Sequence, residues 1–208
     1  MVDFVVTGLS ANSVPYVEAL ELQRATHRAV VERESPDTVI FLEHPSVYTA
    51  GKRTEAHERP TDGTPVIDVD RGGKITWHGP GQLVGYPILH LDEPIDVVGY
   101  VRRLEGILID ALARLGVEGD RVEGRSGVWM RGTDKIAAIG VRVANGVTMH
   151  GFSLNCDNSF EAYESIIACG LADAGVTSIS RELGRRVTTA QAVPIVQAAF
   201  IDHLVVAR

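Results

Sequence analysis

The segment from Asp96 to Leu115 constrains the fold more than any other part of the chain. Its apolar side chains recur every three or four residues, which predicts an amphipathic helix. They are Val97, Val101, Leu104, Leu108, Leu112 and Leu115. Asp96 is a suitable N-cap residue, and Gly116 can adopt the left-handed conformation that ends many helices. A helix of this kind must bury its apolar face against another layer of structure.

Strand-like segments on both sides of this helix can supply that layer. They are Phe4–Val6, Thr38–Leu42, Val66–Val69, Leu83–Leu91, Gly127–Met130, Lys135–Val143 and Val147–Leu154. Further helices are predicted at Pro15–Arg33, Glu161–Ala168 and Ala190–Leu204, with a long irregular loop at Glu43–Pro65. The step Ala144-Asn145-Gly146 has the composition of a hairpin turn. Because helices and antiparallel-looking strands are mixed rather than strictly alternating, we expect an α+β fold, with a mixed sheet flanked by helices.

Length and composition limit the classes of protein that fit. The 208 residues suit a single domain spanning 1–208, and 45% hydrophobic with 23% charged residues is an ordinary globular composition. No apolar stretch approaches the ~20 residues of a membrane-spanning helix. Asp3 stands where a secretory signal carries positive charge, and the net charge of -7 opposes nucleic-acid binding. We therefore expect a cytoplasmic protein with neither membrane nor nucleic-acid partners.

The cysteines and histidines give no pattern typical of a metal site. Cys156 and Cys169 lack the paired spacing of a structural zinc site. The seven histidines lack the i, i+4 pairing of a helical metal site. The sequence therefore predicts no metal ion.

The stretch RGGKITWHGPGQ, from Arg71 to Gln82, is a candidate ligand-binding segment. Its four glycines would let main-chain amides come close to a ligand, although the glycine spacing matches neither of the common phosphate-binding patterns. The same residues could instead form a hairpin with a polar tip. His78 within the stretch is either a hydrogen-bonded structural histidine or a base, and both interpretations stay open.

Lys135 is a candidate general base. It opens the apolar run Ile136–Val141, where loss of hydration would favour a neutral amine able to accept a proton. The alternative is a strand-end lysine whose ammonium group reaches solvent.

Of the two cysteines, Cys169 is the better candidate nucleophile. It stands between Ala168 and Gly170, whose small side chains leave room for a substrate carbonyl. The alternative is a buried, inert thiol. Cys156 precedes Asp157, whose charge opposes thiolate formation, and we interpret it as structural.

Four segments together resemble the octanoyltransferase family of lipoate biosynthesis. They are RGGKITWHGPGQLVGYP at Arg71–Pro87, KIAAIGVR at Lys135–Arg142, TMHGFSLN at Thr148–Asn155 and ACG at Ala168–Gly170. The resemblance implies the α+β catalytic fold shared by biotin and lipoate protein ligases. It also implies transfer of an octanoyl group from octanoyl-acyl carrier protein to a lysine of a lipoyl domain, without any cofactor. The acceptors that it implies are the lipoyl domains of 2-oxoacid dehydrogenases and the glycine cleavage H protein.

The resemblance also implies roles for individual residues. Cys169 would be the nucleophile that carries the acyl group as a thioester, and Lys135 would activate it. The residues that would enclose the acyl group are Arg71, Gly72, Gly73, Lys74, Ile75, Thr76, Trp77, His78, Ala138, Ile139, Gly140, Gly151, Phe152 and Ser153. Many members of the family have proline where this chain has Ala168, a difference that affects local rigidity more than chemistry.

Two other functions share some of these features. An ATP-dependent lipoate or biotin protein ligase would have the same fold, but it needs no cysteine. Such a ligase normally has a glycine-rich pattern that ends in His-Asp, whereas His78 is followed by Gly79-Pro80. A non-catalytic module that binds acyl carrier protein would need neither nucleophile nor base, so Cys169 and Lys135 together favour the transferase.

The net charge of -7 conflicts with the acidic carrier proteins that the resemblance implies as partners. Basic residues must therefore gather near the mouth of the site if charge attraction recruits the carrier. The candidates are Lys52, Arg53, Lys74 and Arg142.

Overall fold

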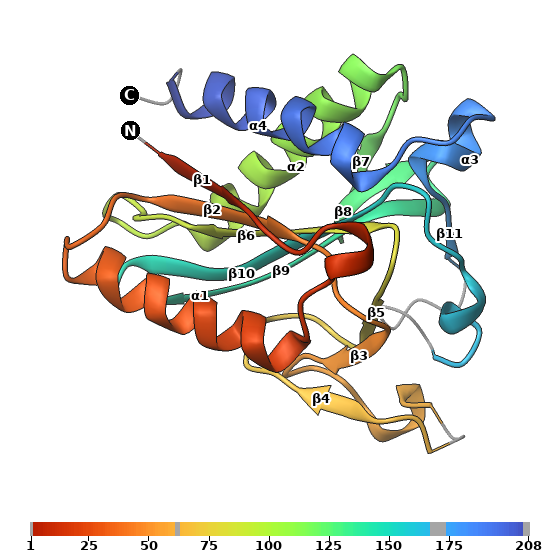
Figure 1. The fold of residues 1–208 in the computed structure, drawn as a ribbon, viewed down its shortest axis with the longest axis horizontal. Coiled ribbons are helices and arrows are strands. Elements are labelled where there is room, and N and C mark those ends of the chain that lie inside the picture. The colour runs from red at the N-terminus through yellow and green to blue at the C-terminus, as the bar shows by residue number, and fades with distance from the viewer. Residues whose placement is uncertain (1, 61–62, 167–173, 206–208) are drawn as a thin grey trace.

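The computed structural model describes residues 2–60, 63–166 and 174–205, and one large sheet runs through its middle (Figure 1). The strands of this sheet are β1 (Asp3–Val6), β2 (Thr38–Leu42), β6 (Gln82–Ile88), β7 (Asp120–Val122), β8 (Arg125–Met130), β9 (Asp134–Ala144), β10 (Val147–Asn155) and β11 (Gly175–Val176). Their order is β1-β2-β6-β10-β9-β8-β7, with β11 paired to β9. Because β1–β2 and β9–β11 are parallel pairs and the other pairs are antiparallel, the expected mixed sheet is confirmed.

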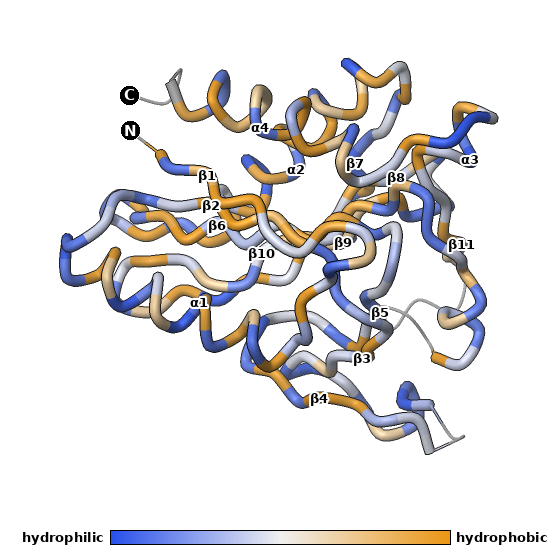
Figure 2. The backbone as a smooth tube through the Cα atoms, in the orientation of Figure 1, coloured by the Kyte–Doolittle hydropathy of each residue, from blue (hydrophilic) through white to orange (hydrophobic). Residues whose placement is uncertain are grey.

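Helices cover both faces of this sheet (Figure 1). On one face lie α2 (Val97–Leu115) and α4 (Thr189–Val205), and on the other lies α1 (Tyr16–Val31). The strand β2 contributes side chains to the hydrophobic cores on both faces of the sheet. Val39 and Phe41 belong to the core beneath α2 and α4. Ile40 and Leu42 belong to the core beneath α1. Side chains that alternate in direction along a strand produce this division. Hydrophobic residues accordingly run along the central strands in Figure 2.

The helix predicted from the apolar spacing forms as expected. The carboxylate of Asp96 accepts a hydrogen bond of 2.8 Å from the backbone N–H of Gly99, which caps the first turn of α2. At the other end Gly116 has φ 89°, a left-handed conformation that glycine adopts without strain. None of the helices in the described ranges is long and apolar enough to cross a bilayer.

The segment Glu43–Pro65, predicted as an irregular loop, contains regular structure. It holds β3 (Val47–Ala50) and a short 3₁₀-helix at Ala56–Glu58. The strand β3 pairs with β4 (Val66–Asp68) and β5 (Thr76–His78) in a second, three-stranded sheet of order β4-β3-β5. The strand β4 matches the segment predicted at Val66–Val69. The strands β3 and β5 depend on pairing with distant parts of the sequence, and local patterns did not reveal them.

Other short elements also differ from the prediction. The helix expected at Glu161–Ala168 is a 3₁₀-turn at Glu161–Tyr163, and Ala168 lies outside the described residues. The helix α3 (Ile179–Leu183) and the 3₁₀-turn at Ser10–Asn12 have too few residues to show a periodic pattern.

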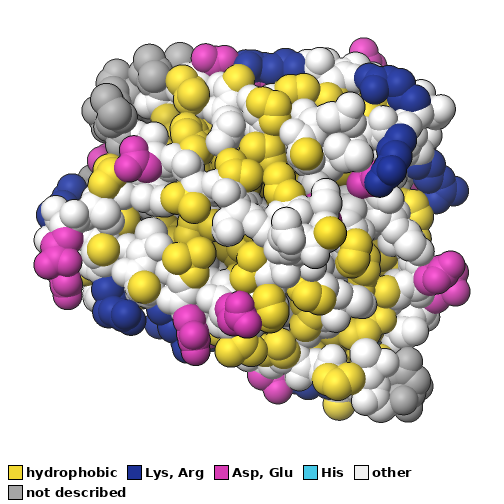
Figure 3. Space-filling view, viewed as in Figure 1, with side chains coloured by type: hydrophobic (Ala, Val, Ile, Leu, Met, Phe, Trp, Pro, Cys, Tyr) yellow, Lys and Arg dark blue, Asp and Glu magenta, His cyan; other side chains and the backbone are white. Residues whose placement is uncertain are grey.

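On the face drawn in Figure 3, charged side chains lie mainly toward the edges, with hydrophobic side chains exposed between them.

Candidate active site

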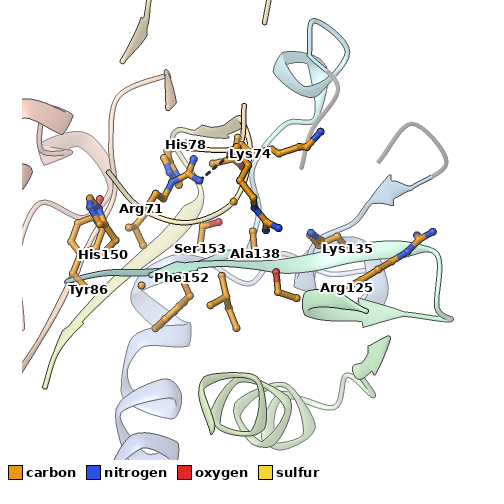
Figure 4. Close-up of a pocket in the computed structure, with 18 of the residues that line it drawn as sticks. Arg71, Lys74, His78, Tyr86, Arg125, Lys135, Ala138, His150, Phe152 and Ser153 are labelled. Atoms are coloured by element: carbon orange, nitrogen blue, oxygen red, sulfur yellow. Dashed lines mark hydrogen bonds between the residues drawn. The ribbon is translucent and has the colours of Figure 1, made fainter. Parts of the chain in front are cut away.

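A cavity of about 260 Å³ lies where the large sheet meets the second sheet and the loop that leads into β5 (Figure 4). Most residues predicted to enclose a substrate line it. They are Arg71, Gly73, Lys74, Thr76, His78, Lys135, Ala138, Ile139, Gly140, Gly151, Phe152 and Ser153. Residues from 71–78, 135–140 and 151–153, which are separate segments of the sequence, therefore meet around one cavity.

Small side chains on β9 and β10 form the floor of the cavity. Gly140 pairs with Gly151, and Ala138 pairs with Ser153, in the antiparallel register of the two strands. Between these pairs, the side chain of Phe152 turns to the opposite side of the sheet, where its ring stacks on Phe200 beneath α4. Figure 4 shows Ser153 and Phe152 pointing to opposite sides of β10. Phe152 therefore contributes backbone to the cavity and side chain to the core, and the small residues leave the space open.

Arg71 organises the loop that covers this floor. Its Nη1 donates hydrogen bonds to the carbonyl oxygens of Gly72 and Lys74, at 3.0 and 2.9 Å. Its Nη2 donates to the carbonyl and hydroxyl oxygens of Thr49 in β3, at 2.8 and 2.9 Å. The loop turns at Gly73, where φ is 86°. Buried and held by these hydrogen bonds, Arg71 fixes the shape of the loop and lines the cavity at the same time.

Three predicted substrate-binding residues do not line the cavity. The N–H of Gly72 donates to the carbonyl oxygen of Val141, which ties the loop to β9. Ile75 and Trp77 pack with Tyr48 and Ile166 in a small separate core. Within β5 side chains alternate, so Thr76 and His78 face the cavity while their neighbours face the opposite side. Substrate contact by the whole segment 71–78 stays a prediction.

Lys135 reaches the cavity because β9 is irregular at its start. Its side chain lines the cavity together with Ala138, three positions later, although such positions face opposite sides of a regular strand. The register with β8 shifts here, with Val128 opposite Ala137 but Trp129 opposite Lys135. A bulge of this kind re-aims a side chain. Lys135 is 9% exposed, and its Nζ lies 4.5 Å from the centroid of the Trp129 ring.

His78 lines the cavity and is buried, with a polar partner near each ring nitrogen. Burial, with a further contribution from nearby His44, lowers the pKa of His78 to about 3. Its Nδ1 lies 2.8 Å from Oε1 of Gln82, and its Nε2 lies 3.4 Å from the hydroxyl of Thr49. Gln82 in turn donates to Oδ1 of Asn155. His78 therefore belongs to a buried hydrogen-bond network that joins β3, β5, β6 and β10.

The structure adds cavity residues that sequence patterns did not select. Tyr16 from α1, Tyr86 from β6, and Arg125 with Ser126 from β8 line it. His150 lines it too, with its Nε2 2.7 Å from Oδ1 of Asp70 and an unusual φ of 56°. Burial lowers the pKa of His150, although the neighbouring Asp70 carboxylate acts in the opposite direction. Its place in the motif TMHGFSLN was the one sequence signal for it.

The two cysteines differ in what the structure says of them. Cys169, with Ala168 beside it, lies outside the described residues. After that segment, Gly175 and Val176 form β11, which pairs with Asp134 and Lys135. Cys156 is fully buried in the core, and burial raises the pKa of its thiol well above the ordinary value. A buried neutral thiol is a poor nucleophile, which agrees with the structural role expected for Cys156.

The basic residues expected at the mouth are not equally available. Lys74 contacts the carboxylates of Glu58 and Glu55, and Arg142 contacts Asp70. Arg53 lines the cavity. Internal ion pairs therefore offset the charge of two of the four candidates. Within the described ranges, no group of three or more His, Cys, Asp or Glu side chains could hold a metal ion.

Comparisons with known proteins place this site in context. Residues 15–201 match the family model described as "Lipoyl protein ligase A/B catalytic domain". The chain is 66% identical over 212 aligned residues to an octanoyltransferase of Clavibacter sepedonicus, covering 98% of this chain and 91% of that protein. It is 60% identical to an octanoyltransferase of Mycolicibacterium smegmatis, covering 92% and 86% of the two chains.

Solved structures with the same fold are more distant in sequence. A lipoate-protein ligase A bound with ATP superimposes with a TM-score of 0.75 at 14% identity, covering 97% of this chain and 85% of that one. The P. falciparum LipL1 in complex with lipoate gives 0.75 at 11% identity, covering 100% and 64%. A biotin protein ligase from Aquifex aeolicus gives 0.56 at 11% identity, covering 97% and 68%. These similarities confirm the fold expected from the sequence.

Proposed function

Since this chain belongs to the family of lipoyl protein ligase A/B catalytic domains, and within it to the octanoyltransferases, we propose that it catalyses octanoyl transfer in two steps through a thioester on Cys169. The octanoyl group comes from octanoyl-acyl carrier protein. It passes to a lysine of a lipoyl domain, in 2-oxoacid dehydrogenases and in the glycine cleavage H protein. The proposal places this reaction of lipoate biosynthesis in the cytoplasm and in a single catalytic domain spanning residues 1–208.

The observation that carries the proposal is the cavity with Lys135 in its wall. Its floor of Ala138, Gly140, Gly151 and Ser153 leaves a space of about 260 Å³. This is near the lower end of the roughly 300–1,000 Å³ found for sites of drug-sized ligands. Such a space suits a slender acyl chain. Lys135 is the buried amine that faces it.

In the first step the neutral amine of Lys135 accepts the proton of the Cys169 thiol. The thiolate attacks the carbonyl carbon of the octanoyl thioester, and the thiol of the carrier leaves with the proton. In the second step Lys135 accepts a proton from the acceptor lysine, whose neutral amine attacks the acyl-enzyme. An amide forms and Cys169 is released as the thiol. Because the octanoyl group arrives as an activated thioester, the reaction needs no ATP.

Intact-mass analysis of the protein after incubation with octanoyl-carrier protein tests this proposal. We expect one octanoyl group per chain, sensitive to hydroxylamine, in the absence of ATP and of any acceptor. Cys169→Ala should abolish the labelling, and Cys156→Ala should keep it, since the Cys156 thiol is buried. Labelling that survives Cys169→Ala, or that depends on ATP, would exclude the thioester route.

A further inference from the structure

Two side chains with hydroxyl groups, Thr76 and Ser153, line the cavity and make no side-chain hydrogen bond to another described residue. Thr76 in β5 is 6% exposed and Ser153 in β10 is 4% exposed. Both side chains line the cavity. A hydroxyl group that reaches a cavity can donate a hydrogen bond to whatever fills it. Two such groups on one cavity therefore point to a ligand atom that accepts hydrogen bonds.

These hydroxyls also line a small recess next to Lys135. The recess has a volume of about 20 Å³, and Thr76, Lys135, Ala138 and Ser153 form walls of both the recess and the larger cavity. This volume is sufficient for one water-sized group, since roughly 10–15 Å³ is the minimum for a single water. A ligand whose chain occupies the cavity can thus place one oxygen atom in the recess.

Another polar residue of the recess is already occupied. The side-chain amide of Asn155 accepts a hydrogen bond from Gln82 and donates one to the carbonyl oxygen of Thr177. Thr76 and Ser153, in contrast, have hydroxyls that can rotate toward an oxygen in the recess. Trp129 lines the recess too, and its buried Nε1 has no hydrogen-bond partner among the described residues. Thr76 and Ser153 are hydroxyl donors beside Lys135 that line both the recess and the larger cavity.

Both hydroxyls stand on backbone that strand pairing holds in place. Thr76 pairs with Thr49 in the second sheet. Ser153 pairs with Val84 on one side and with Ala138 on the other. Donors held in position before the reaction stabilise a developing negative charge without the cost of reorganising. The two strands come from different sheets, so they approach the recess from different directions.

We propose that the recess binds the carbonyl oxygen of the octanoyl thioester and that the hydroxyls of Thr76 and Ser153 donate hydrogen bonds to it. This assignment rests on the thioester route proposed above. When sulfur attacks the carbonyl carbon, a C–S bond forms and the π electron pair moves to oxygen. The oxyanion then collapses, the C=O bond re-forms, and the C–S bond to the carrier breaks. The hydroxyls hold the oxyanion in both acyl transfers.

The test compares octanoylation of Cys169 in a single turnover, at saturating octanoyl-carrier protein, in four variants. Thr76→Val and Ser153→Ala each remove one donor. We expect each to lower the acylation rate by about 10²–10³-fold, the usual effect of one oxyanion donor, with the half-saturating carrier concentration unchanged within about twofold. Thr76→Ser keeps the hydroxyl and should keep most of the rate. Thr26→Val makes the same chemical change at a half-buried position of α1, outside the cavity, and should react like the unaltered protein.

A second measurement reports on the hydrogen bonds directly. Octanoyl-enzyme prepared with a ¹³C-labelled carbonyl should show a higher C=O stretching frequency in Thr76→Val and in Ser153→Ala, because each carbonyl loses a donor. A change of packing alone would not move this band in Thr76→Val while leaving it in place in Thr76→Ser.

The measurements distinguish failure of the recess assignment from failure of the thioester route. If the unaltered protein is acylated and the two donor variants react at the same rate with the same band, the recess holds only water and this assignment fails while the thioester route stands. If Thr76→Ser loses as much rate as Thr76→Val, packing and not hydrogen bonding is responsible. If the unaltered protein carries no octanoyl group on Cys169, both the route and the assignment fail.

Discussion

At the scale of single residues, Lys135 shows how much of a side chain's role comes from its neighbours. The bulge between β8 and β9 turns it to the cavity, and the Trp129 ring lies 4.5 Å from its Nζ. An amine at this distance from an aromatic face is attracted to it while charged. The contact fixes the position of the nitrogen without occupying its hydrogen-bond capacity.

Replacing Lys135 with methionine should depress both halves of the reaction. Methionine keeps much of the packing against Trp129 but cannot accept a proton. Since a general base contributes about 10²–10⁴-fold in rate, we expect losses of that size in acylation of Cys169 and in transfer to a lipoyl domain, measured separately by intact mass.

Lys135→Arg distinguishes a base from a positive charge. Arginine stays protonated in proteins, so this variant should be slow as well. Normal turnover of Lys135→Met, in protein with an unchanged thermal unfolding midpoint, would show that Lys135 has a structural role.

At the scale of elements, the buried carboxylate of Glu105 joins α2 to the β7–β8 hairpin. Its Oε1 accepts a hydrogen bond of 3.0 Å from the N–H of Gly127, and its Oε2 accepts one of 3.1 Å from Nε of Arg121. Nη1 of Arg102, within the helix, donates to the same oxygen. The hairpin carries Arg125 and Ser126 to the cavity, so this side chain links the helix layer to the site.

Glu105→Gln should therefore destabilise the protein more than an ordinary surface change. Because hydrogen bonds to charged groups are each worth about 1.5–3 kcal/mol and the two arginines are partly exposed, we expect a loss of about 1–3 kcal/mol in the free energy of unfolding. Denaturant titration measures it. The matched change at exposed Glu118, Glu118→Gln, should stay within about 0.5 kcal/mol. Equal effects of the two changes would mean that the buried carboxylate does not join the elements.

At the scale of the whole molecule, buried histidines couple stability to pH. Burial lowers the pKa of His44 to about 4, although its hydrogen bond to the Val14 carbonyl acts in the opposite direction. Burial, followed by the effect of His44, lowers the pKa of His78 to about 3. Both rings lie between the layers, in contact with Tyr16. The folded protein therefore keeps both histidines neutral at pH values where the unfolded chain protonates them.

The sign of the effect follows from that difference. Histidine in an unfolded chain binds a proton near pH 6.5. The free energy of unfolding therefore has its full value above this pH and decreases as the pH falls toward 4. At about 1.4 kcal/mol per pKa unit, each histidine costs roughly 2 kcal/mol on going from neutral pH to pH 5.

Denaturant titrations at pH 7.5 and pH 5 measure this loss. The double change His44→Gln with His78→Gln should lower stability at pH 7.5 but weaken the dependence on pH. His57→Gln, at an exposed position, should leave the dependence as it is. An equally steep dependence in the double variant would assign the effect to other groups.

The sequence by itself determined the features that depend on neighbours along the chain. The apolar spacing from Val97 to Leu115 required an amphipathic helix, and Asp96 and Gly116 marked its ends. The motifs around Arg71, Lys135 and His150 identified the family, because matched residues at matched spacing do not require knowledge of contacts. Local periodicity and motif order are properties of the chain before it folds.

Only the tertiary structure decided which side chains face the cavity. Pairing of β3 with β5 turned Thr76 and His78 to the cavity and Ile75 and Trp77 away from it. The pairing of β9 with β10 aligned their small residues into a floor. A bulge against β8 redirected Lys135. Each outcome depends on the register between strands that are distant in the sequence, and a shift of one residue would reverse the direction of every side chain.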